Sequence, residues 1–200
     1  MPRTGDGGRI ALSDEELVSA LRSGDTESLG ILVARWEQPL FRFVRHMLPV
    51  PEDARDVCQE TFLRVLKKAD RFRDGSRFST WMYQIALNLC RDDRRRRRRW
   101  SLILAEPKAD GAGHPLDSVA AAEDPLLPVE RDERSGAVRA ALNALPREQR
   151  EVVVLKEYGG LKFREIAGIL DCPESTVKSR MYYGLSGMRQ SLESRGITEV

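Results

Sequence analysis

The stretch best suited to chemistry is PESTVKSRMYYGL, residues 173 to 185, in which hydroxyl and basic side chains accompany an apolar stripe. Val177, Met181 and Leu185 recur at helical spacing and are predicted to face inward. Pro173 suits a helix start because a backbone donor is not needed there, and Ser175 or Glu174 is expected to cap the helix. The residues left for contact with a polyanion are then Glu174, Ser175, Thr176, Lys178, Ser179 and Arg180.

The residues just before this stretch complete a helix-turn-helix pattern. Residues 163–170 are predicted to form a short helix, residues 171–174 a turn, and Ser175 onward a second helix. In such a unit the second helix enters the major groove of DNA, where its first turns reach base edges and phosphates. The alternative is an ordinary corner of two helices with solvated charges. The pattern favours DNA binding.

A second candidate surface lies near the middle of the chain. Residues 91–99 carry seven arginines against two aspartates, a run that could also be a solvated helix end. Four aromatic residues bracket the turn at residues 73–76 just upstream: Phe72, Phe78, Trp81 and Tyr83. Basic side chains can bind phosphates while neighbouring aromatic rings stack on an unpaired nucleobase. For Phe78, however, we favour core packing.

Other kinds of chemistry are not indicated. We find no nucleophile paired with a base, no phosphate-binding glycine loop and no metal cluster, so neither an enzyme nor a cofactor is predicted. The three cysteines lie far apart without a CxxC pair and the two histidines are isolated, which is typical of buried free thiols. No apolar run reaches the roughly 18 residues that span a bilayer, so we expect a cytoplasmic protein without membrane insertion.

The elements that must position these residues are all helical. Ser13 and Glu16 fit a capping box for a first helix that Gly24 ends. An apolar stripe from residue 29 to residue 47 predicts a long second helix, which Pro39 should kink or split. A third helix follows Pro51, and a fourth begins near residue 78.

The composition then changes, which predicts a domain boundary. The segment from Glu106 to Pro128 holds four prolines and five acids against one lysine, and it is poor in large apolar residues. We therefore expect an all-α fold of two small domains, a four-helix domain and a helix-turn-helix domain, joined by a flexible acidic linker. The predicted parts are a disordered N-terminus at 1–12, domains at 13–100 and 129–195, and the linker at 101–128.

Three stretches together resemble the bacterial sigma factors of RNA polymerase, in the extracytoplasmic-function (ECF) group of the sigma-70 family. DARDVCQETFLRVLKKADRF (53–72) is similar to the polymerase-binding helix, and FSTWMYQIALNLCRDDRRR (78–96) to the helix that recognises and melts the minus-10 element. LPREQREVVVLKEYGGLKFREIAGILDCPESTVKSRMYYGL (145–185) resembles the minus-35 reader. The order of the stretches is that of the family.

The resemblance implies a transcription initiation factor that binds core RNA polymerase, through its clamp helices and flap, and promoter DNA. Contact with the clamp helices is implied for Asp53, Asp56, Gln59, Glu60 and Phe62. Recognition and melting of the minus-10 element is implied for Arg71, Phe72, Arg73, Asp74, Gly75, Ser76, Trp81, Asn88, Arg91, Arg94 and Arg95. Minus-35 recognition is implied for the six outward residues at 174–180, and an anti-sigma factor is an expected regulator.

The sequence also departs from the family pattern. Asp171 and Ser175 stand where glycine is frequent, and Lys162 stands where a capping Ser or Thr is usual. Aspartate tolerates the left-handed conformation, so the turn should survive. Gly184 and Gly187 each cost up to about 1 kcal/mol relative to Ala, so the last helix is expected to fray there.

Two other functions fit parts of the sequence. A DNA-binding regulator that acts independently of polymerase would explain the helix-turn-helix unit. An RNA-binding adaptor would use the arginine run, but it leaves the second domain unexplained.

Overall fold

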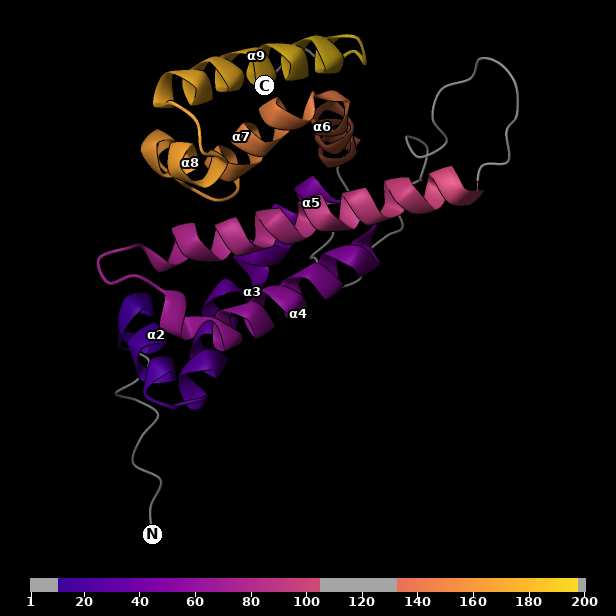
Figure 1. Cartoon of the computed structure of the whole chain (residues 1–200). Coiled ribbons are helices and arrows are strands. Elements are labelled where there is room, and N and C mark those ends of the chain that lie inside the picture. The colour runs from indigo at the N-terminus through magenta and orange to yellow at the C-terminus, as the bar shows by residue number, and fades with distance from the viewer. Residues whose placement is uncertain (1–10, 105–132, 198–200) are drawn as a thin grey trace.

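The computed structural model describes residues 11–104 and 133–197, and these form helices without strands (Figure 1). The elements are α2 (Asp14–Arg22), α3 (Glu27–Met47), α4 (Pro51–Lys67), the short 3-10 helix η1 (Ala69–Arg71), α5 (Phe78–Leu104), α6 (Glu133–Ala144), α7 (Arg147–Glu157), α8 (Phe163–Leu170) and α9 (Glu174–Glu193). The predicted all-α fold with two helical domains is confirmed. The predicted boundaries stay predictions, and residues 105–132 of the expected linker and 1–10 of the expected disordered N-terminus lie outside the described residues.

The first helix begins with the predicted capping box, and the second helix continues through its proline. At the start of α2 the Ser13 hydroxyl accepts a bond from the Glu16 N–H at 3.2 Å, and the Glu16 carboxylate accepts the Ser13 N–H at 2.7 Å. This is the predicted capping box. Pro39 lies inside α3, which continues to Met47, so the proline does not split the helix.

The core of the first domain is built between α3 and α5. Trp36 stands at the centre of an aromatic cluster, with its ring centroid 6.0 Å from those of both Phe78 and Tyr83. The Trp36 indole N–H donates to Asp14 of α2 at 2.9 Å, which ties the first helix to this core. Phe78 and Tyr83 are buried, which confirms core packing for Phe78 and places Tyr83 in the core as well.

In the second domain α8, a turn and α9 form the expected helix-turn-helix. Asp171 ends α8 in the left-handed conformation with φ 50°, which its side chain tolerates. The cap expected from Ser175 or Glu174 does not form, because α9 begins at Glu174 after Pro173, a residue without a side-chain acceptor. At Lys162 half of a capping box forms, since the Glu165 carboxylate accepts the Lys162 N–H at 2.7 Å.

The inward face of α9 differs from the predicted one. Val177 and Met181 are buried as expected, but Leu185 is 47% exposed and Gly184 takes the inward position. A Cβ on Gly184 would lie 2.8 Å from the Val153 side chain, and one on Gly187 would lie 2.9 Å from that of Leu145. The predicted fraying is wrong, because α9 runs to Glu193 and its glycines let α7 and α6 pack closely against it.

We expect the substitution Gly184→Ala to lower the free energy of unfolding by about 1–3 kcal/mol, because overpacking outweighs the gain in helix propensity. Gly168→Ala is the matched control, since an added Cβ in α8 meets nothing within 4 Å. That variant should be more stable than the parent by up to about 1 kcal/mol. Thermal unfolding followed by circular dichroism measures both, and a gain in stability at both positions would contradict the packing argument.

The two domains are in contact. Figure 1 shows α5 lying between the first three helices and the helices α6–α9. Helix α3 contacts α6 and α7, and α5 contacts α8. The surface that the sequence assigned to minus-10 DNA therefore adjoins the second domain.

Candidate nucleic-acid and polymerase interfaces

The outward face of α9 carries the residues predicted to read DNA. Glu174, Ser175, Lys178 and Ser179 are exposed, while Thr176 and Arg180 are half-buried. The Lys178 ammonium pairs with the Glu174 carboxylate one turn earlier, at 2.7 Å. Arg180 leans toward the turn, where its guanidinium lies 3.8 Å from the Cys172 sulfur. The first turns of α9 thus expose hydroxyl groups and a lysine that only a surface ion pair holds. Such groups suit contact with a DNA groove.

The minus-10 candidates lie on α5 and the loop before it. Residues 73–76 are exposed, as are Arg71 and Asn88, whereas Trp81 is half-buried. Phe72 is only 5% exposed and packs on Trp81, with 5.2 Å between ring centroids. Phe72 therefore holds the Trp81 ring in position by packing against it from the core.

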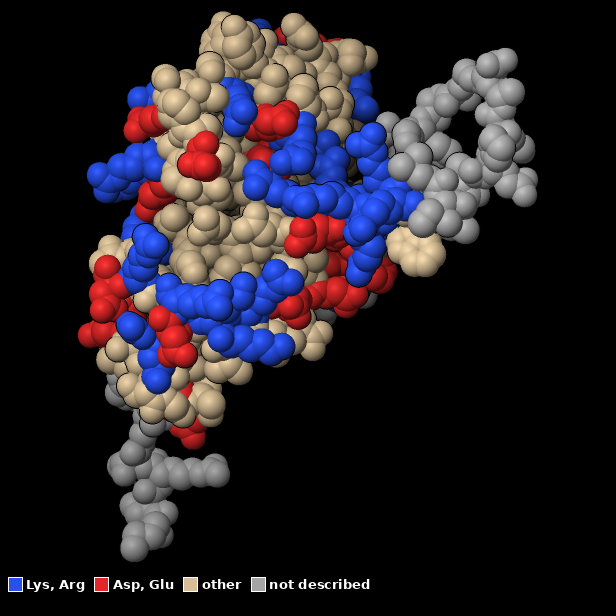
Figure 2. All heavy atoms as spheres, in the orientation of Figure 1, with Lys and Arg blue, Asp and Glu red and all other residues tan. Residues whose placement is uncertain are grey.

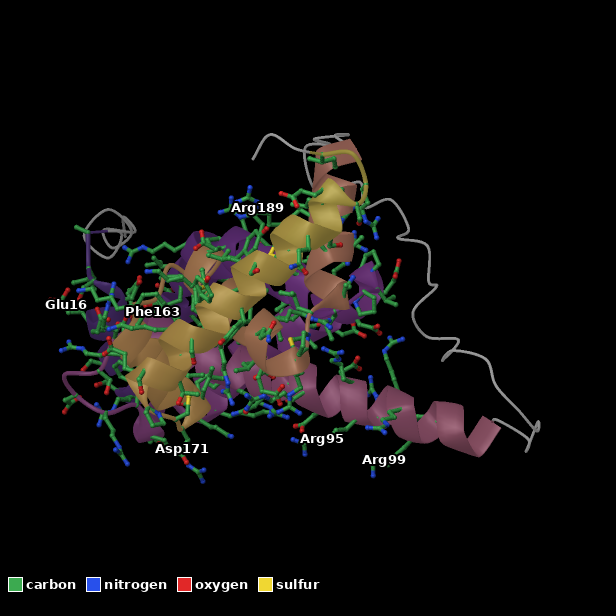
Figure 3. The ribbon with its side chains drawn as sticks, turned by 90° about the horizontal axis from the view of Figure 1, so that it is seen from above. Glu16, Arg95, Arg99, Phe163, Asp171 and Arg189 are labelled. Carbon is green, nitrogen blue, oxygen red and sulfur yellow. The ribbon has the colours of Figure 1, made fainter. Side chains whose placement is uncertain are left out.

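The arginine run continues α5 as a helix. Lys and Arg side chains gather over the C-terminal half of α5 in Figure 2. Within the run the buried Asp93 carboxylate pairs with Arg96 at 2.6 Å and with Arg97 at 3.0 Å. Arg95 is among those left outward, and its side chain is 68% exposed (Figure 3). The run is thus partly structural and partly open to a phosphate backbone.

The polymerase candidates lie along α4, beside an apolar hollow of about 380 Å³ shared with α3. Gln59 and Phe62 line this hollow, Asp56 is exposed, and Glu60 pairs with Arg64 at 2.9 Å. Asp53 differs from the others because it forms an ion pair with Arg97 of α5. No sequence motif indicated that α3 supplies half of the lining: Leu29, Val33, Glu37, Gln38 and Phe41.

One predicted minus-10 residue is engaged by the second domain. The Arg91 guanidinium donates two hydrogen bonds to the Glu151 carboxylate of α7, at 2.9 and 2.6 Å. The Glu151 side chain is only 3% exposed and also accepts from Arg147 at 3.0 Å. Hydrogen bonding to Glu151 raises the pKa of Arg91 above its usual value. Two of the Arg91 donors are thus occupied by the second domain in this structure.

Two further contacts join the domains. The Glu165 carboxylate of α8 accepts bonds from Arg77 and Thr80, each at 3.2 Å. The His46 ring of α3 stacks on Tyr158, with centroids 3.7 Å apart. Burial lowers the pKa of His46 to about 4, against the raising effect of its bond to the Arg42 carbonyl. These interdomain residues were missed by sequence reasoning, since none belongs to a motif.

Cys58 and Cys90 are buried free thiols as expected, whereas Cys172 is only partly buried. Burial raises the pKa of the Cys58 thiol to about 12, and that of Cys90 is raised as well, so neither is reactive near neutral pH. Within residues 11–104 and 133–197 no cluster of three acidic, His or Cys side chains could hold a metal ion. Among the helices described, none is long and apolar enough to cross a bilayer.

The regions that match known protein families coincide with the same two domains. Residues 32–100 match the family model of Sigma-70 region 2, and residues 135–186 match that of Sigma-70, region 4. The ECF RNA polymerase sigma-E factor of Escherichia coli K12 is 31% identical over 175 residues, which cover 86% of this chain and 90% of the relative.

Two solved structures are similar in fold. The structure of CnrH in complex with the cytosolic domain of CnrY has a TM-score of 0.67 and 25% identity, covering 90% of this chain and 97% of that one. The sigma factor RpoE of Bartonella quintana, crystallised with the anti-sigma factor NepR, has a TM-score of 0.63 and 23% identity, covering 80% and 94%. With both sigma regions present in order and a relative of this similarity along most of its length, the chain belongs to the ECF group of the sigma-70 family of RNA polymerase sigma factors.

Proposed function

We propose that this chain binds core RNA polymerase through α4, opens the minus-10 element with α5, and reads the minus-35 element with α9. The observation that carries the proposal is that one chain presents an open apolar hollow on α4 and two separate surfaces, on α5 and α9, with exposed basic and polar side chains. Nucleotidyl transfer belongs to the polymerase, so the chain needs no catalytic group of its own. Its place of action is proposed to be the cytoplasm, where polymerase works.

The polymerase contact is assigned to Asp56, Gln59, Glu60 and Phe62. Gln59 and Phe62 line the hollow, and Asp56 and Glu60 each directly follow a lining residue. The acid and amide groups suit a basic helical target, while Phe62 and its apolar neighbours offer area to bury. Asp53 holds α5 through Arg97 and is assigned a supporting role.

The minus-10 contact is assigned to Trp81, Asn88 and the turn at residues 71–76. Duplex opening requires a base to leave the stack, and the half-buried Trp81 ring, backed by Phe72, offers a surface for it. Arg94 and Arg95 would hold the backbone, joined by Arg91 once Glu151 has released it.

Regulation by an anti-sigma factor is part of the proposal. The RpoE–NepR complex provides a precedent on a similar fold. The apolar hollow on α4 is a surface that such a protein could cover, which would exclude polymerase.

Transcription in vitro with purified core polymerase on a genomic library tests the proposal. The chain should direct initiation from a defined set of promoters.

Lys178→Ala and Arg180→Ala should weaken minus-35 binding, by about 1–3 kcal/mol for a residue that reads a base edge and by less for a phosphate contact. Trp81→Ala and Asn88→Ala should leave duplex binding nearly unchanged but reduce permanganate reactivity of unpaired thymines.

The alternative function, a regulator independent of polymerase, predicts tight duplex binding by the chain alone. If the chain binds duplex DNA tightly by itself and directs no promoter-dependent transcription, the proposed function is rejected. Normal melting by the Trp81→Ala and Asn88→Ala variants would reject the residue roles alone.

A further inference from the structure

Helix α2 lies beside the loop that leads into the minus-10 helix. This entry loop, residues 73–77, connects η1 to α5, and each of its residues is exposed. Helix α2 contacts both η1 and α5 (Figure 1). None of the proposed contacts with polymerase or DNA lies on α2, which ends before residue 32, where the match to Sigma-70 region 2 begins.

Two charged side chains of α2 are bonded to the entry loop or its end. The Glu15 carboxylate accepts the backbone N–H of Phe78, the first residue of α5, at 2.9 Å. The Arg22 guanidinium donates to the Asp74 carboxylate at 2.8 Å. Glu15 and Arg22 lie about two helical turns apart on α2, with the buried Val18 between them, so they share one face of the helix. That face holds the entry loop near its start and at its end.

The entry loop has little else to fix its shape. Its one turn is closed by the Ser76 N–H, which donates to the Arg73 carbonyl at 3.1 Å, and Gly75 adopts φ 80° there, which glycine does without strain. Phe72 before the loop and Phe78 after it are buried. The core therefore fixes the flanks, whereas the exposed turn between them belongs to the least stable part of a fold.

The two bonds from α2 differ in strength. The Phe78 N–H belongs to the first turn of α5, whose N–H groups have no acceptor within the helix, and a carboxylate there also faces the positive end of the helix dipole. The Glu15 bond is partly buried and charge-assisted. The Asp74 side chain is 89% exposed, so its pair with Arg22 is a surface ion pair that contributes little. Glu15 is therefore the principal anchor.

The hold by α2 does not depend on the second domain. Glu165 of α8 also binds this region, through Arg77 and Thr80, but it leaves when the domains separate. Glu15 and Arg22 belong to the same domain as the entry loop, so their bonds remain in either arrangement.

We propose that Glu15 and Arg22 are positioning residues for the minus-10 element, because they hold the entry loop and the start of α5 in the shape that receives a base extruded from the duplex. Neither residue needs to touch DNA. The inference rests on the proposed minus-10 role of this loop and of Trp81, whose N–H donates to the Arg77 carbonyl at 3.2 Å. A loop that is already held loses less conformational entropy when the base enters.

Open-complex formation tests the proposal. The full chain, assembled with core polymerase, is mixed with a promoter duplex recovered by transcription that carries the fluorescent base aminopurine in its minus-10 element. Glu15→Ala removes a negative charge, so electrostatic attraction alone predicts a stronger interaction with DNA. Positioning predicts the opposite, an equilibrium constant for opening that is about tenfold lower, the cost of ordering about one residue of backbone. Arg22→Ala should lower it about twofold, as expected for a surface ion pair.

Discrimination between bases separates positioning from a general loss of folded protein. A second duplex replaces the minus-10 base that the parent chain discriminates best. The ratio of open complexes on the two duplexes should fall toward one in the Glu15→Ala variant, because a loosely held loop reads the base less well. Partial unfolding would lower both complexes equally and leave the ratio unchanged. Glu15→Gln keeps an oxygen acceptor for the Phe78 N–H and should restore most of the ratio.

A matched control exists on α4. Glu52→Ala with Lys67→Ala removes an exposed acid from the first turn and an exposed base from the last turn of that helix. Glu15 and Arg22 occupy the same places on α2. The control variant should open both duplexes as the parent does.

Opening by Glu15→Ala that equals or exceeds that of the parent would overturn the proposal, and so would an unchanged ratio. Equal losses in the Gln and Ala variants would also overturn it, because the hydrogen bond would then not be the cause. If the parent chain directs no transcription, the proposed function fails first. If the parent opens promoters and only the Glu15 results disagree, this inference alone is wrong.

Discussion

Reversing the charges of Asp56 and Glu60 together is expected to weaken binding to core RNA polymerase at least tenfold, about 1.4 kcal/mol or more. Asp56 is exposed and Glu60 is partly exposed on α4. Each directly follows a residue that lines the apolar hollow, Arg55 and Gln59 respectively. Lysines at these positions would face a basic target across the interface, and like-charge contacts of this kind cost several kcal/mol. The change should not unfold the domain, since neither side chain is in the core. Competition against the parent chain for core polymerase measures the loss.

A matched control is available on the same helix. Glu52→Lys changes an exposed acid in the first turn of α4, and neither chain neighbour of Glu52 lines the hollow. It should leave polymerase affinity close to that of the parent. Equal affinity for the double reversal and this control, with helical content preserved, would remove Asp56 and Glu60 from the interface.

Local chemistry explains why the helix-turn-helix unit could be predicted from sequence. The buried positions 177 and 181 are one helical turn apart in α9, and Asp171 can adopt the left-handed turn that the corner needs. These signals act within a few residues and do not depend on the rest of the fold. These local signals were therefore enough to predict which residues of α9 face outward.

The misjudged positions share a different cause. Leu185 was expected inside and Gly184 was expected to weaken the helix, because periodicity and propensity treat a helix in isolation. In the fold α7 approaches so closely that Val153 has room only beside a glycine. Tertiary packing therefore placed Gly184, and not Leu185, on the buried face of α9.

The contact between the domains had no sequence signal at all. Arg91 and Glu151 are 60 positions apart, and each reads as an ordinary charge on a helix. The same holds for Arg77 and Glu165, 88 positions apart. Composition could suggest two domains, but only the fold brings these pairs together.

We expect Arg91→Glu to open the contact between the domains. The substitution replaces two charge-assisted hydrogen bonds with a carboxylate facing the buried Glu151 carboxylate. Breaking a fully buried pair costs about 3–5 kcal/mol; since the Arg91 side chain remains 20% exposed, about 2 kcal/mol is expected here. This shifts the docking equilibrium about thirtyfold. Small-angle X-ray scattering of the full chain should report a larger radius of gyration.

A fall in pH should also weaken the contact between the two domains. Burial, to which stacking on Tyr158 contributes, holds the pKa of His46 near 4, and Arg45 and Arg139 also lower it. The separated form therefore binds a proton more readily as the pH falls from about 6.5 toward 4, and docking weakens over that window. At neutral pH both forms hold a neutral ring, so the docked form keeps its full stability.

The control for the Arg91 substitution is Arg95→Glu, which makes the same charge change one turn along α5. Arg95 is 68% exposed and lies 3.9 Å from Asp92 of its own helix. Its substitution should leave the radius of gyration at the parent value. If Arg91→Glu also leaves it unchanged at neutral pH, the Arg91–Glu151 pair does not hold the domains together. If it opens the chain, the pair holds the domains together, and the proposed contact of Arg91 with minus-10 DNA competes with docking.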